Sequence, residues 1–286
     1  MRSLALLGLV VALLAATALA SPWVAWGVAA LTGRPFTFTR VYDRVFEVLL
    51  VVGLVAAWRR LDLGGAADIG FRRAGWGRQL ATGFFVGAAG LVVGLGVAAL
   101  LGGIVPALRY PAAKTLRKAF LGLGAATVIG VGEEALFRGV LLRRLGRDAG
   151  RVGGVIATTV LYAAVHAIGR GRLAGPVHAW SGVERTAALL APLTDPSALP
   201  ALAGLAGLGL LLAWARLRSG GLWLPIGIHA AWVAAFRVGR LFFAIQPGPP
   251  WLVGVGWPPL VGGATGWIAV GVGALLLART RRGARA

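Results

Sequence analysis

Long runs without a charged residue constrain this chain more than any other feature. The 31 residues between Arg2 and Arg34 carry no charge, and further uncharged apolar runs follow. About 20 apolar residues in an α-helix cross the roughly 30 Å of hydrocarbon in a bilayer. Lipid offers no hydrogen-bonding partners, and no long alternating strand pattern is present, so helices must satisfy the backbone. The sequence therefore predicts an all-α fold, a polytopic membrane helix bundle.

We expect about eight transmembrane helices in a single integral membrane domain that covers residues 1–286. The expected spans follow the apolar runs and lie at about 3–33, 41–58, 79–104, 119–145, 152–168, 198–215, 221–244 and 259–278. Segments 59–78 and 169–197 are expected to be interfacial connections. The first segment also resembles a signal peptide, but its apolar run continues past Trp26, which favours a retained span.

Composition excludes several classes of protein. Only 13% of the residues are charged and 58% are hydrophobic, whereas a soluble domain has about 25% charged residues. A soluble enzyme, a disordered chain and a coiled coil are therefore poor fits. The net charge of +20 comes from short basic clusters between apolar runs, a pattern typical of loops on anionic lipid headgroups rather than of nucleic-acid binding. The absence of cysteine excludes disulfides and thiolate chemistry.

The basic residues also give a topology and a source. Lys and Arg are slightly more frequent in the loops that share a side with the termini, so both termini are expected in the cytoplasm. Arginine greatly outnumbers lysine and asparagine is absent, which indicates a GC-rich bacterial genome. We therefore expect a multi-pass protein of the bacterial inner or plasma membrane.

Small residues recur at helical spacing in the third expected span. Gly83 and Gly87 form one pair and Gly90 and Gly94 form another. Glycines at this spacing let the backbone of a second helix approach closely. We therefore expect tight helix packing along this span.

Adjacent carboxylates in the fourth expected span are the most unusual polar feature. An ionisable group at the centre of a membrane helix costs about 2.5–3.5 kcal/mol. Glu134 and Arg138 are four residues apart, hence about 40° apart around a helix, and can form an ion pair. Glu133 is about 140° from Arg138 and has no partner on its own helix. We expect Glu134–Arg138 to be a structural pair and Glu133 to be available for chemistry.

Two of the three histidines also lie within apolar helices. His166 follows Tyr162 by one helical turn, so both share one face. His229 follows Gly227, which is expected to leave room beside the imidazole. The third histidine, His178, falls in the proline-rich connection and is expected to be a loop residue.

One carboxylate and two imidazoles from three helices have a short list of uses. They can activate water, with Glu133 as the general base. They can bind a divalent metal, such as zinc, as a His₂Glu set with an open position. They can relay protons in a transporter. The residue spacing does not choose among these uses, and it differs from the i,i+4 histidine pair of soluble zinc proteases.

At these residues the chain resembles the CPBP family, the CAAX-protease and bacteriocin-processing group of intramembrane endopeptidases. The family pattern Glu-Glu-x-x-x-Arg is complete at Glu133, Glu134 and Arg138. The second pattern, Phe-x-x-x-His, corresponds to Tyr162 and His166, with Tyr in place of Phe. The third, His-x-x-x-Asn, begins at His229 but has a valine at its last position. The resemblance covers residues 115–240 in detail.

The resemblance implies an activity and a role for each residue. Glu133 and His166 would activate a water molecule, and His229 with the family asparagine would stabilise the oxyanion. Val233 stands where that asparagine is expected, and Arg237 is one substitute donor. The family has been described both as metal-dependent and as metal-free; we favour no cofactor, with zinc bound by Glu133, His166 and His229 as the alternative.

The leading hypothesis is an intramembrane endopeptidase that cleaves a membrane-associated protein or peptide. A catalytically silent binding or immunity protein on the same scaffold is the alternative, because Val233 removes one donor. A proton-coupled transporter is the third hypothesis, and it lacks support from internal repeats. Prenylated CAAX proteins are the eukaryotic substrates of the family, and we do not expect them in a bacterium.

Overall fold

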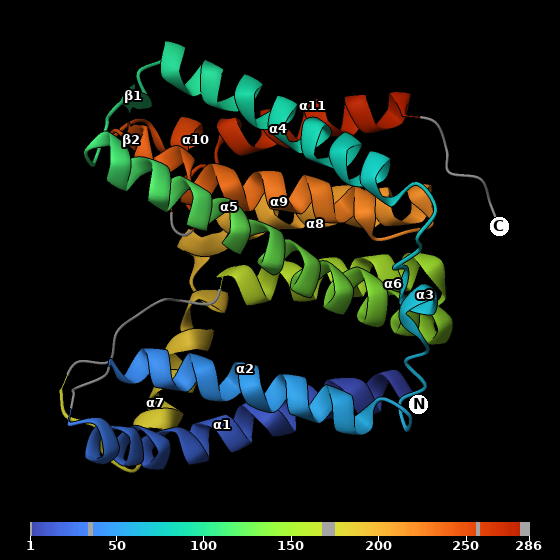
Figure 1. The fold of residues 1–286 in the computed structure, drawn as a ribbon, viewed down its shortest axis with the longest axis vertical. Helices are drawn as coiled ribbons and strands as arrows, with labels where there is room; N and C mark the ends of the chain where they lie inside the picture. The colour runs from blue at the N-terminus through green and yellow to red at the C-terminus, as the bar shows by residue number, and fades with distance from the viewer. Residues whose placement is uncertain (1, 34–36, 168–174, 256–257, 281–286) are drawn as a thin grey trace. The chain divides into compact units, whose positions relative to one another are not determined.

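The computed structural model describes residues 2–33, 37–167, 175–255 and 258–280. The described chain is predominantly helical (Figure 1), which confirms the predicted all-α class. Contacts divide it into two compact units, a division that the sequence did not predict. The first unit comprises Met1–Gly64 and Ile168–Asp195, and the second comprises Gly65–Ala167 and Pro196–Ala286.

The described residues of the first unit form three α-helices. These are α1 (Arg2–Thr32), α2 (Phe38–Ala57) and α7 (Ser181–Leu190), followed by the short helix η2 (Ala191–Leu193). Phe38, Val41 and Tyr42 of α2 pack in its core with Ala25 of α1. The Tyr42 hydroxyl lies 2.6 Å from Oγ1 of Thr186 on α7. The expected connection 169–197 thus contains a helix, and its residues 169–174 lie outside the described residues.

The second unit contains the remaining helices and one small sheet. In chain order its elements are α3 (Ala66–Ile69), α4 (Trp76–Leu100), β1 (Ile104–Pro106), α5 (Ala112–Glu134), the π-helix η1 (Ala135–Leu141), α6 (Leu142–Ala167), η3 (Pro196–Ala198), α8 (Leu199–Ser219), α9 (Trp223–Arg237), η4 (Gly239–Leu241), β2 (Phe243–Ile245), α10 (Pro250–Val253) and α11 (Ala264–Arg279). Helix α9 packs between α4 and α5, and α8 packs against α6 (Figure 1).

The glycine stripes of α4 bring two helices close, as predicted. A Cβ atom on Gly83 would lie 2.1 Å from the carbonyl oxygen of Leu224 on α9, and one on Gly90 would lie 2.3 Å from that of Ala269 on α11. Gly227 of α9 differs from the expectation. A Cβ there would meet the carbonyl oxygen of Leu80 at 2.2 Å, so Gly227 serves the contact with α4 rather than leaving room beside His229.

A pair of short strands shortens two expected spans. β1 and β2 are antiparallel, with Ile104 opposite Ile245. Because β2 takes residues 243–245, α9 ends at Arg237, well before the expected end at 244. The last helix likewise begins at Ala264 rather than at 259, because Leu260 packs in a core cluster beside the strands.

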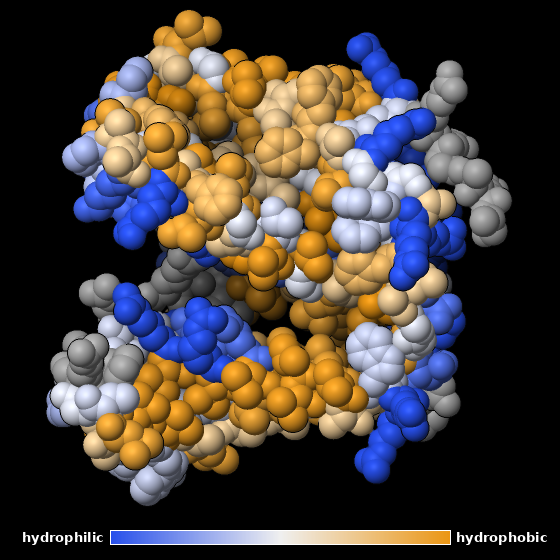
Figure 2. Space-filling model, in the orientation of Figure 1, coloured by the Kyte–Doolittle hydropathy of each residue, from blue (hydrophilic) through white to orange (hydrophobic). Residues whose placement is uncertain are grey.

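Four stretches of the described residues are long and apolar enough to cross a membrane: Ser3–Thr32, Trp76–Leu100, Ala112–His166 and Pro196–Ser219. The expected count of about eight is not confirmed. Ala112–His166 contains two expected spans, and a break at Gly150 (φ 73°, ψ 167°) divides it. On the face of the second unit in Figure 2, hydrophobic side chains cover the middle of the helices and hydrophilic ones gather toward the ends, as a bilayer requires.

Candidate active site

The two adjacent carboxylates lie at a change of helix type. Helix α5 ends at Glu134, and the next seven residues form the π-helix η1, which carries Arg138. π-helical turns are rare and often occur at functional sites. The wider turn still leaves the predicted ion pair in place, because Nη1 of Arg138 lies 2.9 Å from Oε1 of Glu134 and both side chains are buried.

Glu134 has a second partner that sequence analysis missed. Its Oε1 also accepts a hydrogen bond from Nδ1 of His229 at 2.8 Å, although the two residues are 95 positions apart in the sequence. The carboxylate is therefore held by a guanidinium from its own chain segment and by an imidazole from α9. Since a carboxylate bound to one ring nitrogen fixes the orientation of the imidazole, Glu134 positions His229.

Arg138 ties the carboxylate to a third helix. Its Nη2 donates to the carbonyl oxygen of Gly209 on α8 at 3.1 Å, and its guanidinium lies 4.4 Å from the ring centre of Tyr162 on α6. A guanidinium over an aromatic face is a favourable cation–π contact. The charge of Arg138 is thus balanced by Glu134 and its position is fixed by α6 and α8.

Tyr162 supports His166 in two ways. Nδ1 of His166 lies 2.8 Å from the carbonyl oxygen of Tyr162. The two rings lie 4.1 Å apart between centroids, with 35° between their planes. Tyr162 itself is buried. The aromatic residue one turn before the histidine therefore forms the surface on which the imidazole rests, and tyrosine fills that place as phenylalanine would.

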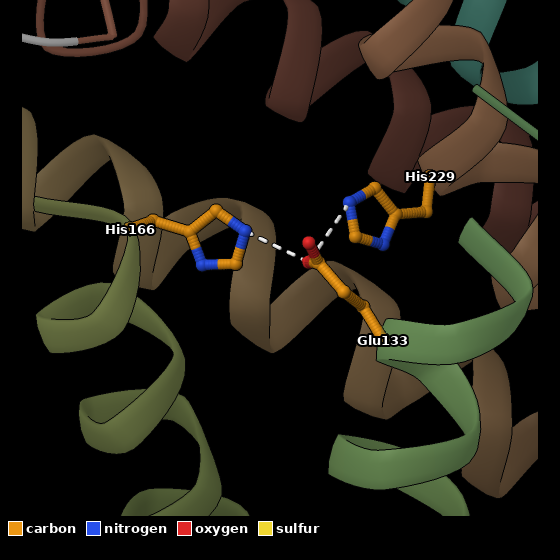
Figure 3. Close-up of side chains that lie close together, drawn as sticks. All are labelled: Glu133, His166 and His229. Carbon is orange, nitrogen blue, oxygen red and sulfur yellow. Dashed lines mark ion pairs between the residues drawn. The ribbon is translucent and has the colours of Figure 1, made fainter. Parts of the chain in front are cut away.

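Glu133 lies between the two imidazoles (Figure 3). Its Oε2 is 2.9 Å from Nε2 of His166 and 3.6 Å from Nε2 of His229. The Glu133 side chain is 33% exposed and that of His166 is 21% exposed, whereas His229 is 3% exposed. The structure thus brings together the three residues that the sequence singled out, with His229 at the buried side and Glu133 at the accessible side.

The hydrogen-bond partners of the two Nδ1 atoms determine which nitrogen of each imidazole faces Glu133 with a lone pair. A carbonyl oxygen and a carboxylate only accept hydrogen bonds, so Nδ1 of His166 and Nδ1 of His229 each carry a proton. In the neutral rings both Nε2 atoms then hold lone pairs, and both face Oε2 of Glu133. Among the described residues, that Oε2 is buried without a hydrogen-bond partner. Three acceptors at one point are stable together only with a proton, a water molecule or a cation between them.

This donor set also fits a divalent metal. One ligand atom from each of Glu133, His166 and His229 lies within 4.8 Å of the others. Histidines that bind metals usually donate their second N–H to a carbonyl or a carboxylate, as both histidines do here. Two imidazoles and one carboxylate are a known zinc ligand set with an open position. The three residues could therefore hold a metal.

The remaining site candidates are less closely tied to the cluster. Val233 lies one turn after His229 on α9 and is half-buried, so it can offer no hydrogen bond from its side chain. Arg237 is exposed at the last residue of α9. His178 belongs to the first unit and lies outside any helix or strand, as predicted. Its Nε2 lies 3.2 Å from Oε2 of Glu184, so it takes part in a local pair away from the cluster.

Apolar helices that enclose a carboxylate and two histidines define the class of the protein: a helical membrane protein with a polar cluster inside its bundle. Residues 115–235 match the family model described as type II CAAX prenyl endopeptidase Rce1-like. This match confirms the resemblance to the CPBP family of intramembrane proteases and supports, at the level of the family, a CAAX-type peptidase in a multi-pass membrane protein. Searches of curated proteins and of solved structures gave no significant match.

Proposed function

We propose that this protein is an intramembrane endopeptidase that hydrolyses a peptide bond in a membrane-associated protein or peptide. The convergence of Oε2 of Glu133 with the two Nε2 atoms supports this proposal most strongly. Such a cluster binds a water molecule beside a base, and the family match contributes the reaction class. The partial exposure of Glu133 and His166 leaves a route for a substrate carbonyl.

Glu133 is the general base in this proposal. A water molecule between Oε2 of Glu133 and Nε2 of His166 donates one proton to the carboxylate while its oxygen attacks the scissile carbonyl carbon. The tetrahedral intermediate then collapses, the C–N bond breaks, and the proton on Glu133 passes to the leaving amine. Proton transfer by a positioned side chain contributes about 10²–10⁴ in rate.

His229 stabilises the oxyanion of the intermediate. Its Nδ1 proton is already donated to Glu134, so Nε2 donates to an oxyanion only when the ring carries a second proton. The Glu134 carboxylate lies 2.8 Å away and balances the charge of that imidazolium. Buried Glu134 therefore acts as a positioning residue for the oxyanion donor rather than as a base.

A metal is not assigned to this reaction. An ion held by Glu133, His166 and His229 would supply a Lewis acid that polarises water or the scissile carbonyl. We retain the metal-free mechanism because Glu133 and His166 can hold and deprotonate water by themselves. Removal of metal tests this choice directly.

A catalytically silent relative that binds a membrane polypeptide, such as an immunity protein, is the second candidate function. Val233 favours it, because the family pattern has an asparagine amide at this position. Loss of one oxyanion donor costs about 10²–10³ in rate in well-studied hydrolases. An active enzyme with Val233 is therefore expected to be slow.

The test is cleavage of a membrane-anchored peptide reporter by purified protein in proteoliposomes. Wild type is expected to produce fragments, and Glu133→Ala is expected to produce none at the same protein level. Asp148→Ala serves as the control, because Asp148 is a partly exposed carboxylate that lies outside the cluster and pairs with Arg144. Equal fragment yields from wild type and Glu133→Ala would reject the endopeptidase and leave the silent relative.

A further inference from the structure

Arginine side chains line a second polar feature of the second unit, a cavity of about 260 Å³. A single buried water needs only about 10–15 Å³ in such a measure, so the cavity holds a much larger group. Its other lining residues are two leucines and one glycine. The five arginines are Arg138, Arg143, Arg147, Arg151 and Arg216.

The break at Gly150 places these side chains together. Arg143 and Arg147 lie four residues apart on the first limb of α6, and Arg151 is the first residue after the break. The two limbs touch through glycines, because a Cβ on Gly154 would lie 2.6 Å from the backbone nitrogen of Gly146. The N-terminal end of the second limb therefore adjoins the cavity, and the helix dipole favours an anion there.

Two of the arginines have unused donors. Nε of Arg138 and Nε of Arg216 are buried, and neither has a hydrogen-bond partner among the described residues. Arg216 comes from the last turn of α8, so the cavity gathers cations from separate helices. Guanidinium groups bind phosphate oxygens through paired N–H donors, and a ligand of this kind would supply the missing acceptors.

We propose that this cavity binds the phosphate groups of an anionic phospholipid. Basic pockets between the helices of membrane proteins bind multiply charged lipid headgroups. Leu142 and Leu217 complete the lining, and Leu217 is 37% exposed, so acyl chains have apolar surface next to the charged headgroup. The proposal does not depend on peptidase activity.

Arg138 connects this cavity to the proposed active site. It lines the cavity and it also holds Glu134 through Nη1. A lipid in the cavity therefore lies one side chain away from the carboxylate that positions His229. Binding of the lipid stabilises α6 beside the site without contact with Glu133.

The test is native mass spectrometry of delipidated protein in detergent, titrated with cardiolipin, phosphatidylglycerol or phosphatidylcholine. The pocket variant is Arg151→Gln/Arg216→Gln. The control is Arg109→Gln/Arg117→Gln, which removes the same charge from exposed positions on the same unit. We expect wild type and control to retain anionic lipid, and the pocket variant to bind it at least roughly tenfold more weakly, as expected for lost charge-assisted contacts.

Separate arms with inorganic phosphate and pyrophosphate distinguish a free anion from a lipid. Binding of these ions at lipid-like affinity, without retention of lipid, would overturn the lipid as the source. Equal weakening in the pocket and control variants would show only general attraction and would also overturn the proposal. If the double variant does not fold, Arg151→Gln alone is measured, since that side chain is exposed, and unchanged lipid affinity there rejects the cavity.

Discussion

Arg138 stands between two polar regions of the second unit that are built in opposite ways. In the cluster of Glu133, His166 and His229, carboxylates alternate with proton-bearing groups, and Glu134 joins Arg138 to His229. In the cavity beside it, five guanidinium groups share one lining. Around the cluster, Glu134 pairs with both Arg138 and His229, whereas in the cavity the buried Nε atoms of Arg138 and Arg216 have no hydrogen-bond partner among the described residues. The cluster is therefore suited to chemistry, and the cavity is suited to binding an anionic ligand.

The largest expected effect falls on the cluster at Val233. Val233→Asn should raise turnover of the reporter by up to about 10²–10³, because the new amide lies one turn from His229 and can donate to the same oxyanion. Steady-state cleavage by wild type and variant measures it. The double variant Glu133→Ala/Val233→Asn should be inactive. A fast wild type that Val233→Asn slows would show that another group, such as Arg237, is the donor.

The next effect concerns stability. Glu134→Gln should lower the free energy of unfolding by about 3–5 kcal/mol, because it leaves the buried charge of Arg138 without its partner. Glu133→Gln should have a smaller effect, since Glu133 is partly exposed. Melting temperatures in one detergent compare the two variants. Equal losses would contradict the division between a structural carboxylate and a reactive one.

Close helix packing should matter for the cluster and not for lipid affinity. Gly83→Ala should destabilise by about 1–3 kcal/mol, because its Cβ would lie 2.1 Å from a carbonyl oxygen of α9, the helix that carries His229. Gly77→Ala is the control on the same helix, with nothing within 4 Å of its Cβ. Cleavage should fall for Gly83→Ala alone, while cardiolipin affinity stays constant. A fall of cardiolipin affinity in Gly83→Ala as well would contradict the prediction and show that the cluster and the cavity depend on the same helix packing.

The smallest expected effect is that of metal removal. Dialysis against a chelator should leave cleavage unchanged, because Glu133 and His166 activate water without an ion in the proposed mechanism. Elemental analysis of the dialysed protein verifies that no zinc remains bound to it. Loss of cleavage that added zinc restores would replace this mechanism with a metal-dependent one on the same three residues.

The sequence was most informative where polar groups interrupt apolar helices. The high cost of such groups in lipid singles out Glu133, His166 and His229 without knowledge of the fold, and their proximity is what the structure adds. The Glu134–Arg138 pair was predictable because residues four apart on a helix lie near one another, and the π-helical turn keeps them in contact. The catalytic roles of these residues remain a proposal.

Features that depend on distant segments were not predictable. The bond from His229 to Glu134 joins residues far apart in sequence, and the contact of Gly227 with α4 depends on how the helices pack. The strands β1 and β2 are too short to leave a periodic pattern. One part of the arginine cavity was visible in the sequence, namely the four-residue spacing of Arg143, Arg147 and Arg151. The break at Gly150 and the proximity of Arg216 depend on the fold and could not be predicted.

The π-helix η1 has a consequence for how this segment tolerates mutation. A π-helical turn holds more residues than an α-helical one, so the chain between Glu134 and Leu142 carries surplus length. An in-frame loss of one codon here would let the segment relax into an α-helix and would nearly keep the phase of everything after it relative to Glu134, because fewer α-helical residues turn the chain as far as the wider π-helical ones do. Point mutations at its apolar positions leave that phase intact. Loss of one residue is therefore expected to disturb helix phase less in this stretch than in the α-helices that flank it, where it turns the chain by about 100°.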